Sequence, residues 1–264
     1  ACQGCPASVA LRVAFKALGR NTLMAVIASC TSVLQSPFPV SALDLPVINM
    51  AFASGGAVAS GISAAADRLV KQGVFEEKPT ILVWAGDGGT YDIGIQALSG
   101  AAERSADLIY VCYNNEAYSN TGTQRSGATP YMAWTTNTVD GKKEWRKDIA
   151  QIMIAHNIPY VATASLAYPT DMYRKFAKAK EIKGTRYIEI QAPCPPGWKF
   201  SSAYTIKISR LAVKTGMWLL YEHEEGKTTY TAGTRRLIMG QSKLKPVEEY
   251  LELWRLTRRG PSEP

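Results

Sequence analysis

The sequence of 264 residues predicts an α/β fold in which helices flank a parallel sheet. Apolar runs rich in β-branched residues alternate with stretches of helical period along most of the chain. The length suffices for one large domain with a buried core, or for two small ones. Because no internal repeat and no flexible linker interrupts this alternation, we predict one α/β domain over residues 1–216 and a C-terminal extension over 217–264.

Each predicted element follows from a local pattern. Helices are expected where apolar residues recur every three or four positions, and strands where short apolar runs end in glycine or polar residues. In chain order, the sequence predicts a helix at 7–18, a strand at 23–29, an Ala-rich helix at 56–72, a strand and glycine turn at 80–89, a helix at 91–104, a strand at 107–115, a long polar loop, a helix at 147–156, a strand at 160–165, a helix at 169–181, a strand at 186–193 and a helix at 204–216.

The C-terminal extension has a different character. Residues 218–233 read as a hairpin that turns at Glu225-Gly226, and residues 245–256 read as a short amphipathic helix. These patterns predict an appendage to the α/β domain.

The chain carries a formal net charge of +8, which predicts attraction to an acidic partner. The alternative is a basic surface that serves no particular partner. Basic residues gather towards the C-terminus without the interleaved aromatics or the motif of a nucleic-acid module. We therefore expect an acidic protein partner, and neither DNA nor RNA. No run of eighteen apolar residues and no signal peptide is visible, so we expect a cytoplasmic protein with no membrane partner.

Two neighbouring strand ends carry residues suited to a metal-bound phosphate. Gly86, Asp87 and Gly88 follow one strand, and Asn115 follows the next strand along the chain. Parallel strands present their carboxyl ends at one edge of the sheet, where ligands bind. Asp87, Asn115 and a loop carbonyl near Ala117 would there bind Mg²⁺ together with a diphosphate. The alternative is a glycine turn and an Asn-rich loop that serve turn geometry alone.

This pair of strand ends resembles the thiamine-diphosphate motif, in which Gly-Asp-Gly is followed by Asn-Asn. The stretch GDGGTYDIGIQALSGAAERSADLIYVCYNNEAYSNTGTQRSGATP closely resembles the β subunit of pyruvate:ferredoxin oxidoreductase and its 2-oxoacid relatives, oxalate oxidoreductase included. Further similarity lies in AHNIPYVATASLAYP, APCPPGW, LAVKTGMWLLYE and KPVEEYL. The resemblance spans nearly the whole chain.

The resemblance implies a role for each matching residue. Asp87 and Asn115 would bind Mg²⁺ through their side chains and Ala117 through its carbonyl. Asn120 would be a catalytic residue near the thiazolium and the substrate. The residues implied along the diphosphate are Gly86, Gly88, Thr121 and Gln124. The glutamate that activates the cofactor would come from a partner α chain, so this chain would hold half of an active site.

The five cysteines are Cys2, Cys5, Cys30, Cys112 and Cys194. Their odd number, without a secretory signal, disfavours a disulfide framework. Four of them lie at element ends, with Cys30 expected at the end of a strand, and can converge on one site, whereas Cys112 lies inside an apolar strand and is expected in the core. The spacing alone leaves zinc, an iron–sulfur cluster and a redox dithiol open. The resemblance implies a [4Fe-4S] cluster held by Cys2, Cys5, Cys30 and Cys194.

The resemblance implies oxidative decarboxylation of pyruvate or oxalate, with electrons passing through the cluster to ferredoxin. A ferredoxin-like partner chain, and coenzyme A in the pyruvate type, are implied with it. The chain departs from the pyruvate type at SCTSVLQSPFPVSAL, at FASGG and at Asn114, where carboxylates are missing. Loss of negative charge near the reacting centre favours a more anionic substrate, so oxalate is expected as a substrate as much as pyruvate is. Branched 2-oxoacids and 2-oxoglutarate are less expected, because the enzymes that use them are expected to resemble this chain less.

Two other functions are possible. A non-catalytic module with four cysteines could serve assembly or electron relay, and metal and thiamine analysis separates it from the enzyme. A nicotinamide-binding enzyme is disfavoured, because no Gly-x-Gly-x-x-Gly follows the first predicted strand.

Overall fold

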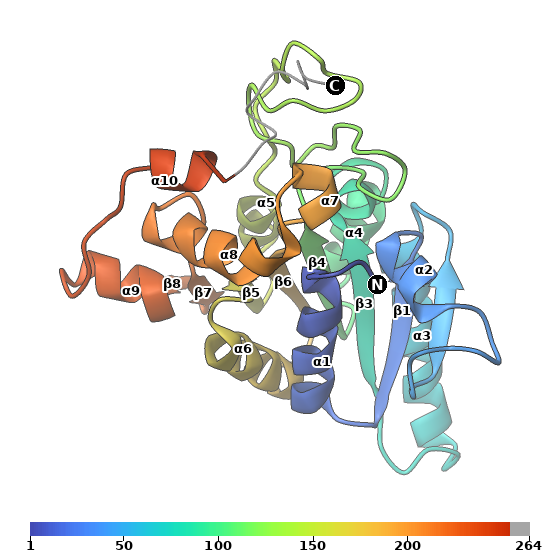
Figure 1. Ribbon diagram of the computed structural model, residues 1–264. Helices are drawn as coiled ribbons and strands as arrows, with labels where there is room; N and C mark the ends of the chain where they lie inside the picture. The colour runs from blue at the N-terminus through green and yellow to red at the C-terminus, as the bar shows by residue number, and fades with distance from the viewer. Residues whose placement is uncertain (254–264) are drawn as a thin grey trace.

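A computed structural model describes residues 1–253 and contains one eight-stranded sheet in the order β2-β1-β3-β4-β6-β5-β7-β8 (Figure 1). Neighbouring strands from β2 to β5 in this order pair in parallel, and β7 and β8 join in antiparallel fashion. The strands are β1 (Thr22–Ile27), β2 (Val47–Met50), β3 (Thr80–Gly86), β4 (Leu108–Asn114), β5 (Tyr160–Ser165), β6 (Thr185–Gln191), β7 (Tyr221–Glu224) and β8 (Lys227–Tyr230). This mostly parallel sheet confirms the predicted fold class.

Helices cover both faces of the sheet. Helices α1 and α6 pack over one face, and α3, α4 and α5 pack over the other (Figure 1). The helices are α1 (Pro6–Leu18), α2 (Cys30–Gln35), α3 (Gly55–Lys71), α4 (Ile95–Glu103), α5 (Ile149–Ala155), α6 (Pro169–Glu181), α7 (Pro195–Trp198), α8 (Thr205–Lys214), α9 (Ala232–Ile238) and α10 (Glu248–Leu251), with a π-helical turn η1 (Gly88–Asp92) and a 3₁₀ turn η2 (Ser202–Tyr204).

The central strands are buried on both faces, which explains the continuous apolar runs of β3 and β4. Every residue of β4 and of β6 is buried. Successive side chains alternate between the two helical layers, so that Val111 packs on the side of α1 while Tyr110 packs on the side of α3. The carboxyl ends of β3 and β4 therefore emerge between two covered faces, where the loops that follow can form a pocket.

The predicted elements are found within a few residues of their expected bounds, with informative differences. Cys30 does not end a strand: β1 stops at Ile27, and Cys30 begins the short helix α2. The helix expected at 91–104 begins only at Ile95, because the turn η1 precedes it. The short elements β2, α7 and α9 were not predicted, since segments of four to seven residues leave little periodic signal.

The predicted hairpin is confirmed, and it extends the main sheet through the antiparallel pairing of β7 with β5. Glu225 and Gly226 have positive φ angles of 51° and 73°, as a tight two-residue hairpin turn requires. Of the helix predicted at 245–256, α10 covers Glu248–Leu251, and residues 254–256 lie outside the described residues. Within residues 1–253, no helix is long and apolar enough to cross a membrane.

Candidate functional site

A cavity of about 430 Å³ opens at the carboxyl ends of β3 and β4. It is built from the turn after β3, the loop after β4, the segment after β1, and Phe52. Most of the predicted site residues line it, namely Gly86, Asp87, Gly88, Asn115, Ala117, Asn120 and Thr121. The fold therefore brings together residues that lie far apart along the chain.

The side chain of Asn115 reaches three groups at once. One end of its amide lies 3.2 Å from Oδ1 of Asp87, 2.5 Å from the carbonyl oxygen of Ala117 and 2.9 Å from Oγ of Ser119. When that end is the nitrogen, it donates hydrogen bonds to these groups. When it is the oxygen, oxygens of Asp87, Asn115 and Ala117 converge with no hydrogen between them, which is how ligands surround a bound cation. These three residues thus fit Mg²⁺.

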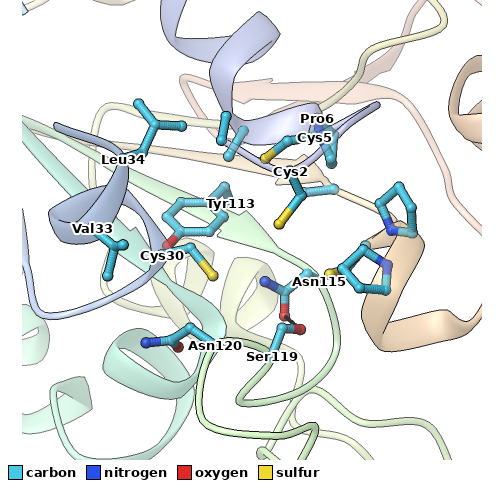
Figure 2. Close-up of a pocket in the computed structure, with 16 residues that line it drawn as sticks. Cys2, Cys5, Pro6, Cys30, Val33, Leu34, Tyr113, Asn115, Ser119 and Asn120 are labelled. Carbon is cyan, nitrogen blue, oxygen red and sulfur yellow. Dashed lines mark hydrogen bonds between the residues drawn. The ribbon is translucent and has the colours of Figure 1, made fainter. Parts of the chain in front are cut away.

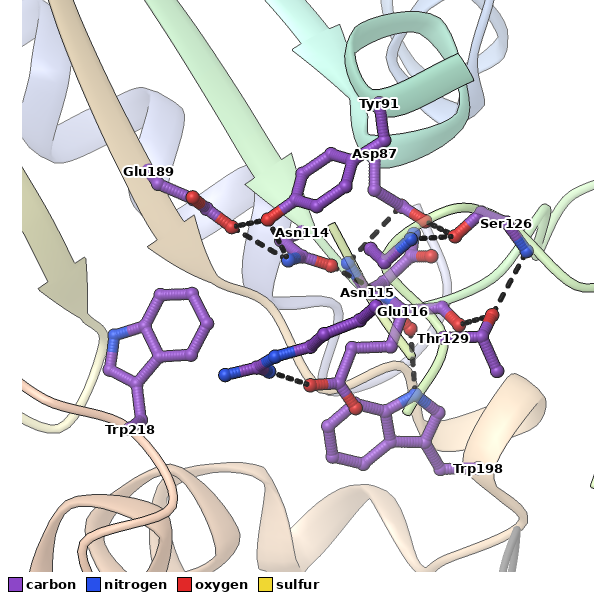
Figure 3. Close-up of polar contacts among 12 residues, drawn as sticks. Asp87, Tyr91, Asn114, Asn115, Glu116, Ser126, Thr129, Glu189, Trp198 and Trp218 are labelled. Atoms are coloured by element: carbon purple, nitrogen blue, oxygen red, sulfur yellow. Dashed lines mark hydrogen bonds and ion pairs between the residues drawn. The ribbon is translucent and has the colours of Figure 1, made fainter. Parts of the chain in front are cut away.

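Asp87 is a buried carboxylate, with only 1 % of its surface exposed. The Ser126 hydroxyl donates a hydrogen bond to Oδ2, and the backbone N–H of Asn115 donates to Oδ1 at 3.4 Å (Figure 3). Burial raises the pKa of Asp87 to about 7, because these hydrogen bonds only partly replace the lost water. No lysine or arginine within residues 1–253 forms an ion pair with it. A bound cation would supply the missing positive charge.

Asp87 and its neighbour Glu116 predict how the stability of the metal-free protein depends on pH. Burial raises the pKa of Glu116 to about 7 as well, against the opposing effect of Arg146. Because both carboxyls have a higher pKa in the folded protein than in the unfolded chain, their protonated forms stabilise the fold, and this stabilisation is lost as pH rises through 7. Between pH 5.5 and 8, we expect the free energy of unfolding to fall by roughly 2–4 kcal/mol relative to a double variant, Asp87→Asn with Glu116→Gln. Urea unfolding in the presence of a chelator measures the difference, and identical pH profiles for the two proteins would contradict it.

The loop after β4 is fixed by Tyr118 and Asp92. The Tyr118 hydroxyl donates to Oδ2 of Asp92 at 2.6 Å, and the backbone N–H of Gly127 donates to the same oxygen at 3.0 Å. The Tyr118 ring lies so close to Gly88 that a β-carbon there would sit 1.9 Å from its Cε1. Gly88 is therefore needed for the approach of this ring, in addition to the diphosphate contact that the sequence predicts.

We expect Gly88→Ala to displace the Tyr118 ring and to lower the free energy of unfolding by about 1–3 kcal/mol, the usual effect of overpacking. Thiamine diphosphate should bind more weakly to this variant. Gly61→Ala is the matched control, because Gly61 lies in α3 with no atom within 4 Å of the added carbon. Chemical unfolding and a cofactor titration check both variants, and unaltered stability and affinity in Gly88→Ala would contradict the packing role.

The remaining predicted residues lie along the rim of the loop. Asn120 is exposed and lines the cavity mouth. The Thr121 hydroxyl donates to Oε1 of Gln124 at 2.5 Å, and Nε2 of Gln124 donates to the Thr121 carbonyl at 2.9 Å. Gln124 is thus held against Thr121, and it is not among the residues that line the cavity.

Four cysteines line a second cavity, of about 360 Å³. Figure 2 shows the sulfur atoms of Cys2, Cys5 and Cys30 pointing into it, and Cys194 also lines it. Cys5 and Cys194 cap the starts of α1 and α7, and Cys30 is the first residue of α2. The thiolate is the form that binds metal, and burial raises the pKa of Cys194, so its thiolate needs a positive partner. Cys112 is fully buried in β4, so its predicted place in the core is confirmed.

The four thiols line one cavity and could hold either a single ion or an iron–sulfur cluster. Burial, followed by the proximity of Cys194, Cys5 and Cys2, raises the pKa of Cys30 to about 12, so bare thiolates here need a positive partner. Around one zinc ion, four sulfurs would stand about 3.8 Å apart, given Zn–S bonds of about 2.3 Å. Within residues 1–253, no three Cys, His, Asp or Glu side chains are already placed around the position of a single ion. An iron–sulfur cluster holds its thiolates farther apart, at separate irons.

The two cavities adjoin. Residues that line both are Cys30, Tyr113, Asn115, Ser119 and Asn120. Helix α7, which begins after Cys194, contributes the indole N–H of Trp198, which donates to the Asn115 carbonyl at 2.7 Å. The segment that bears Cys194 is therefore hydrogen-bonded to Asn115, a residue that would bind the cation.

A buried polar network behind the Asp87 and Asn115 segments was not predicted. Glu189, in the middle of β6, accepts hydrogen bonds from the Tyr91 hydroxyl and from Nδ2 of Asn114 at 2.7 Å (Figure 3). The Tyr187 hydroxyl also donates to it, at 3.3 Å. A glutamate between two isoleucines, in a strand predicted to lie inside the sheet, was the available signal in the sequence. The sequence alone predicts Glu189 only as part of a strand.

Comparisons with known proteins agree with this geometry. Residues 29–190 match the thiamine pyrophosphate enzyme, C-terminal TPP binding domain. The ketoisovalerate oxidoreductase subunit VorB of Pyrococcus abyssi is 47% identical, over 96% of this chain and 81% of that protein. The pyruvate synthase subunit PorB of Methanothermobacter thermautotrophicus is 46% identical, over 95% of this chain and 84% of that protein. A 2-oxoglutarate:ferredoxin oxidoreductase from Magnetococcus marinus shares the fold, with a TM-score of 0.64 at 19% identity, covering 96% of this chain and 90% of that one.

One expectation is corrected by these comparisons. Ketoisovalerate is a branched 2-oxoacid, and the VorB subunit is as similar to this chain as the PorB subunit is, so the expected lower similarity to branched-substrate enzymes is wrong. The matched domain covers both ligand-bearing strand ends, and the relatives match almost the whole chain. The chain belongs to the thiamine pyrophosphate enzymes and, among them, to the β subunits of the 2-oxoacid:ferredoxin oxidoreductases.

Proposed function

We propose that this chain binds two groups side by side: thiamine diphosphate, which it holds through Mg²⁺, and a [4Fe-4S] cluster. With them it carries out the oxidative decarboxylation of a 2-oxoacid. The observation that carries the proposal is the convergence of Asp87, Asn115 and the Ala117 carbonyl at the carboxyl edge of the sheet. When bound, thiamine diphosphate supplies the carbon nucleophile for the 2-oxo group and accepts the electron pair left by decarboxylation. A cation bound by these three residues would anchor its diphosphate.

The residues of this chain position and shield the reacting groups. Asn120, at the mouth of the cavity, can donate an amide hydrogen bond to the substrate. Phe52 and Tyr118 line the same cavity, and their rings lie 6.0 Å apart, which limits the access of water. Cys2, Cys5, Cys30 and Cys194 would hold the cluster that accepts electrons from the adjoining cavity.

A monocarboxylic 2-oxoacid, of the pyruvate or ketoisovalerate type, fits this chain better than oxalate does. Among residues 1–253, those that line the cavity include an apolar ring at Phe52 and no lysine or arginine to bind a second carboxylate. The sequence favours oxalate because carboxylates are missing near the reacting centre. The described residues that line the cavity add no positive charge that would bind the second carboxylate of oxalate. Oxalate is tested as the alternative substrate.

The site needs partner chains. Asp87 is the one carboxylate among the described residues that line the cofactor cavity, and its place is beside the cation. This fits the implication of the family resemblance that a partner α chain supplies the glutamate that activates thiamine, and we assign that glutamate to the α chain. A ferredoxin-like chain and ferredoxin would accept the electrons, with coenzyme A as the acyl acceptor when pyruvate is the substrate. The net charge of +8 favours encounter with an acidic ferredoxin.

Anaerobic turnover of the assembled complex tests this function. The complex is given pyruvate, ketoisovalerate or oxalate, with and without coenzyme A, while reduction of a low-potential acceptor is followed. We expect reduction with pyruvate or ketoisovalerate. If only oxalate supports reduction, and does so without coenzyme A, the substrate is oxalate and not a monocarboxylic 2-oxoacid. If none of the three substrates supports reduction at full cofactor content, the proposed function is contradicted.

A further inference from the structure

Glu189 ties together the two segments that carry the cation ligands. It is 97 % buried, with 3 % of its surface exposed, in the strand β6 that pairs with β4. One of its oxygens, Oε1, accepts hydrogen bonds from both the Tyr91 hydroxyl and Nδ2 of Asn114. Figure 3 shows these groups meeting beside Asp87 and Asn115.

The two donors to Glu189 belong to different ligand segments. Tyr91 lies in η1, the turn that begins directly after Asp87. Asn114 is the last residue of β4 and precedes Asn115. Nδ2 of Asn114 also donates to the Tyr91 hydroxyl at 3.2 Å, and Oδ1 of Asn114 accepts from the backbone N–H of Glu116 at 2.9 Å. A single carboxylate oxygen thereby links the turn after β3 to the loop after β4.

The hydroxyl of Tyr91 is a fixed donor in this link. Burial, together with the nearby Glu189 carboxylate, holds the pKa of Tyr91 well above its ordinary value, so the phenol keeps its proton. Tyr187 donates to the other oxygen of Glu189, at 3.3 Å, and belongs to β6 itself. Its hydrogen bond therefore holds Glu189 without joining the ligand segments. The chain thus offers two buried tyrosines that bind the same carboxylate, of which one alone bears on the spacing of the ligands.

We propose that Glu189 is a positioning residue that sets the spacing between Asp87 and Asn115 and so makes the site select Mg²⁺ over Ca²⁺. This inference rests on the proposed function. Mg²⁺ demands near-octahedral geometry at about 2.0–2.1 Å, whereas Ca²⁺ accepts longer and more variable distances, about 2.3–2.6 Å. Loosening the link between the two segments must therefore weaken Mg²⁺ more than Ca²⁺, while a general loss of stability weakens both alike.

The test measures the affinities of Mg²⁺ and Ca²⁺ for the metal-free complex in the presence of thiamine diphosphate, by titration calorimetry. In Tyr91→Phe, we expect the ratio of Mg²⁺ to Ca²⁺ affinity to fall by about tenfold, the usual size of an effect transmitted through a partner of a metal ligand. Tyr187→Phe is the matched control and should keep the wild-type ratio within about twofold. Glu189→Gln retains an oxygen that can accept from both Tyr91 and Asn114, and should also keep the ratio.

Each other outcome has a definite meaning. Equal losses for the two cations in Tyr91→Phe, or the same shift in Tyr187→Phe, would overturn the positioning role. A Glu189→Gln protein that stays folded but loses the selectivity would support the role of Glu189 and show that the link needs its carboxylate. If the wild-type complex binds thiamine diphosphate without any divalent cation, the proposed function itself is contradicted, and the two failures are thereby distinguished.

Discussion

Replacing Asp87 with asparagine should abolish cation-dependent binding of thiamine diphosphate while leaving the protein folded. Asparagine keeps the shape of the side chain and can still accept from Ser126, but it removes the one carboxylate at the site. We expect Mg²⁺ affinity to fall by more than about 100-fold, since even the outer partners of metal ligands contribute 10–100-fold. Because burial raises the pKa of Asp87, the metal-free variant should be at least as stable as the wild type at pH 8.

The measurement is calorimetric titration of the metal-free complex with Mg²⁺ and thiamine diphosphate, together with iron analysis. Iron content should not change, because Asp87 does not line the cysteine cavity. Glu116→Gln is the control: it also removes a buried carboxyl of raised pKa, but one that faces Arg146, at 3.6 Å. Wild-type cofactor affinity in Asp87→Asn would refute the assignment of Asp87 as a ligand.

Replacing Cys30 with serine should remove the cluster while keeping thiamine diphosphate bound. Cys30 begins α2 and lines both cavities, so it stands between the proposed cluster and the cation site. Loss of one of four thiolates should leave the cluster incomplete, and reduction of a low-potential acceptor should fall to background. Cofactor affinity should change little, because the cation ligands are elsewhere on the cavity wall.

Iron and acid-labile sulfide analysis, with electron paramagnetic resonance of the reduced complex, checks the Cys30 variant. Cys112→Ala is the matched control, since Cys112 is fully buried in β4 away from the cysteine cavity. We expect a full cluster in the control. Full iron content and a normal reduced-cluster signal in Cys30→Ser would remove Cys30 from the ligand set.

Most of the sheet was predictable from the sequence because its central strands are buried on both faces. Such strands, like β3 and β4, are continuous apolar runs that polar or glycine residues terminate. The edge strand β2 has no such signal, since it is four residues long and half exposed. The turn η1 was read as the start of a helix, because its backbone continues into α4 and local sequence does not distinguish the two.

The sequence predicted the candidate site where the residue types themselves indicate the chemistry, as the cation ligands do. It predicted the site only partly where packing in the folded chain determines which groups are in contact. Asp87, Asn115 and Ala117 converge as expected, because the carboxyl ends of β3 and β4 must meet. Gln124 instead turns towards Thr121, a choice between polar partners that sequence cannot settle. The link through Glu189 joins three separate segments, and only the folded sheet brings them into contact.

A crystal structure of the complete complex with thiamine diphosphate and Mn²⁺ in place of Mg²⁺ tests the central claim most directly. The anomalous signal locates the cation without reference to the protein atoms. We predict one peak at bonding distance from the Asp87 carboxylate, the Asn115 amide oxygen and the Ala117 carbonyl, with the diphosphate oxygens completing the set. A peak elsewhere, or a bound cofactor whose cation none of these three residues touches, would contradict the account.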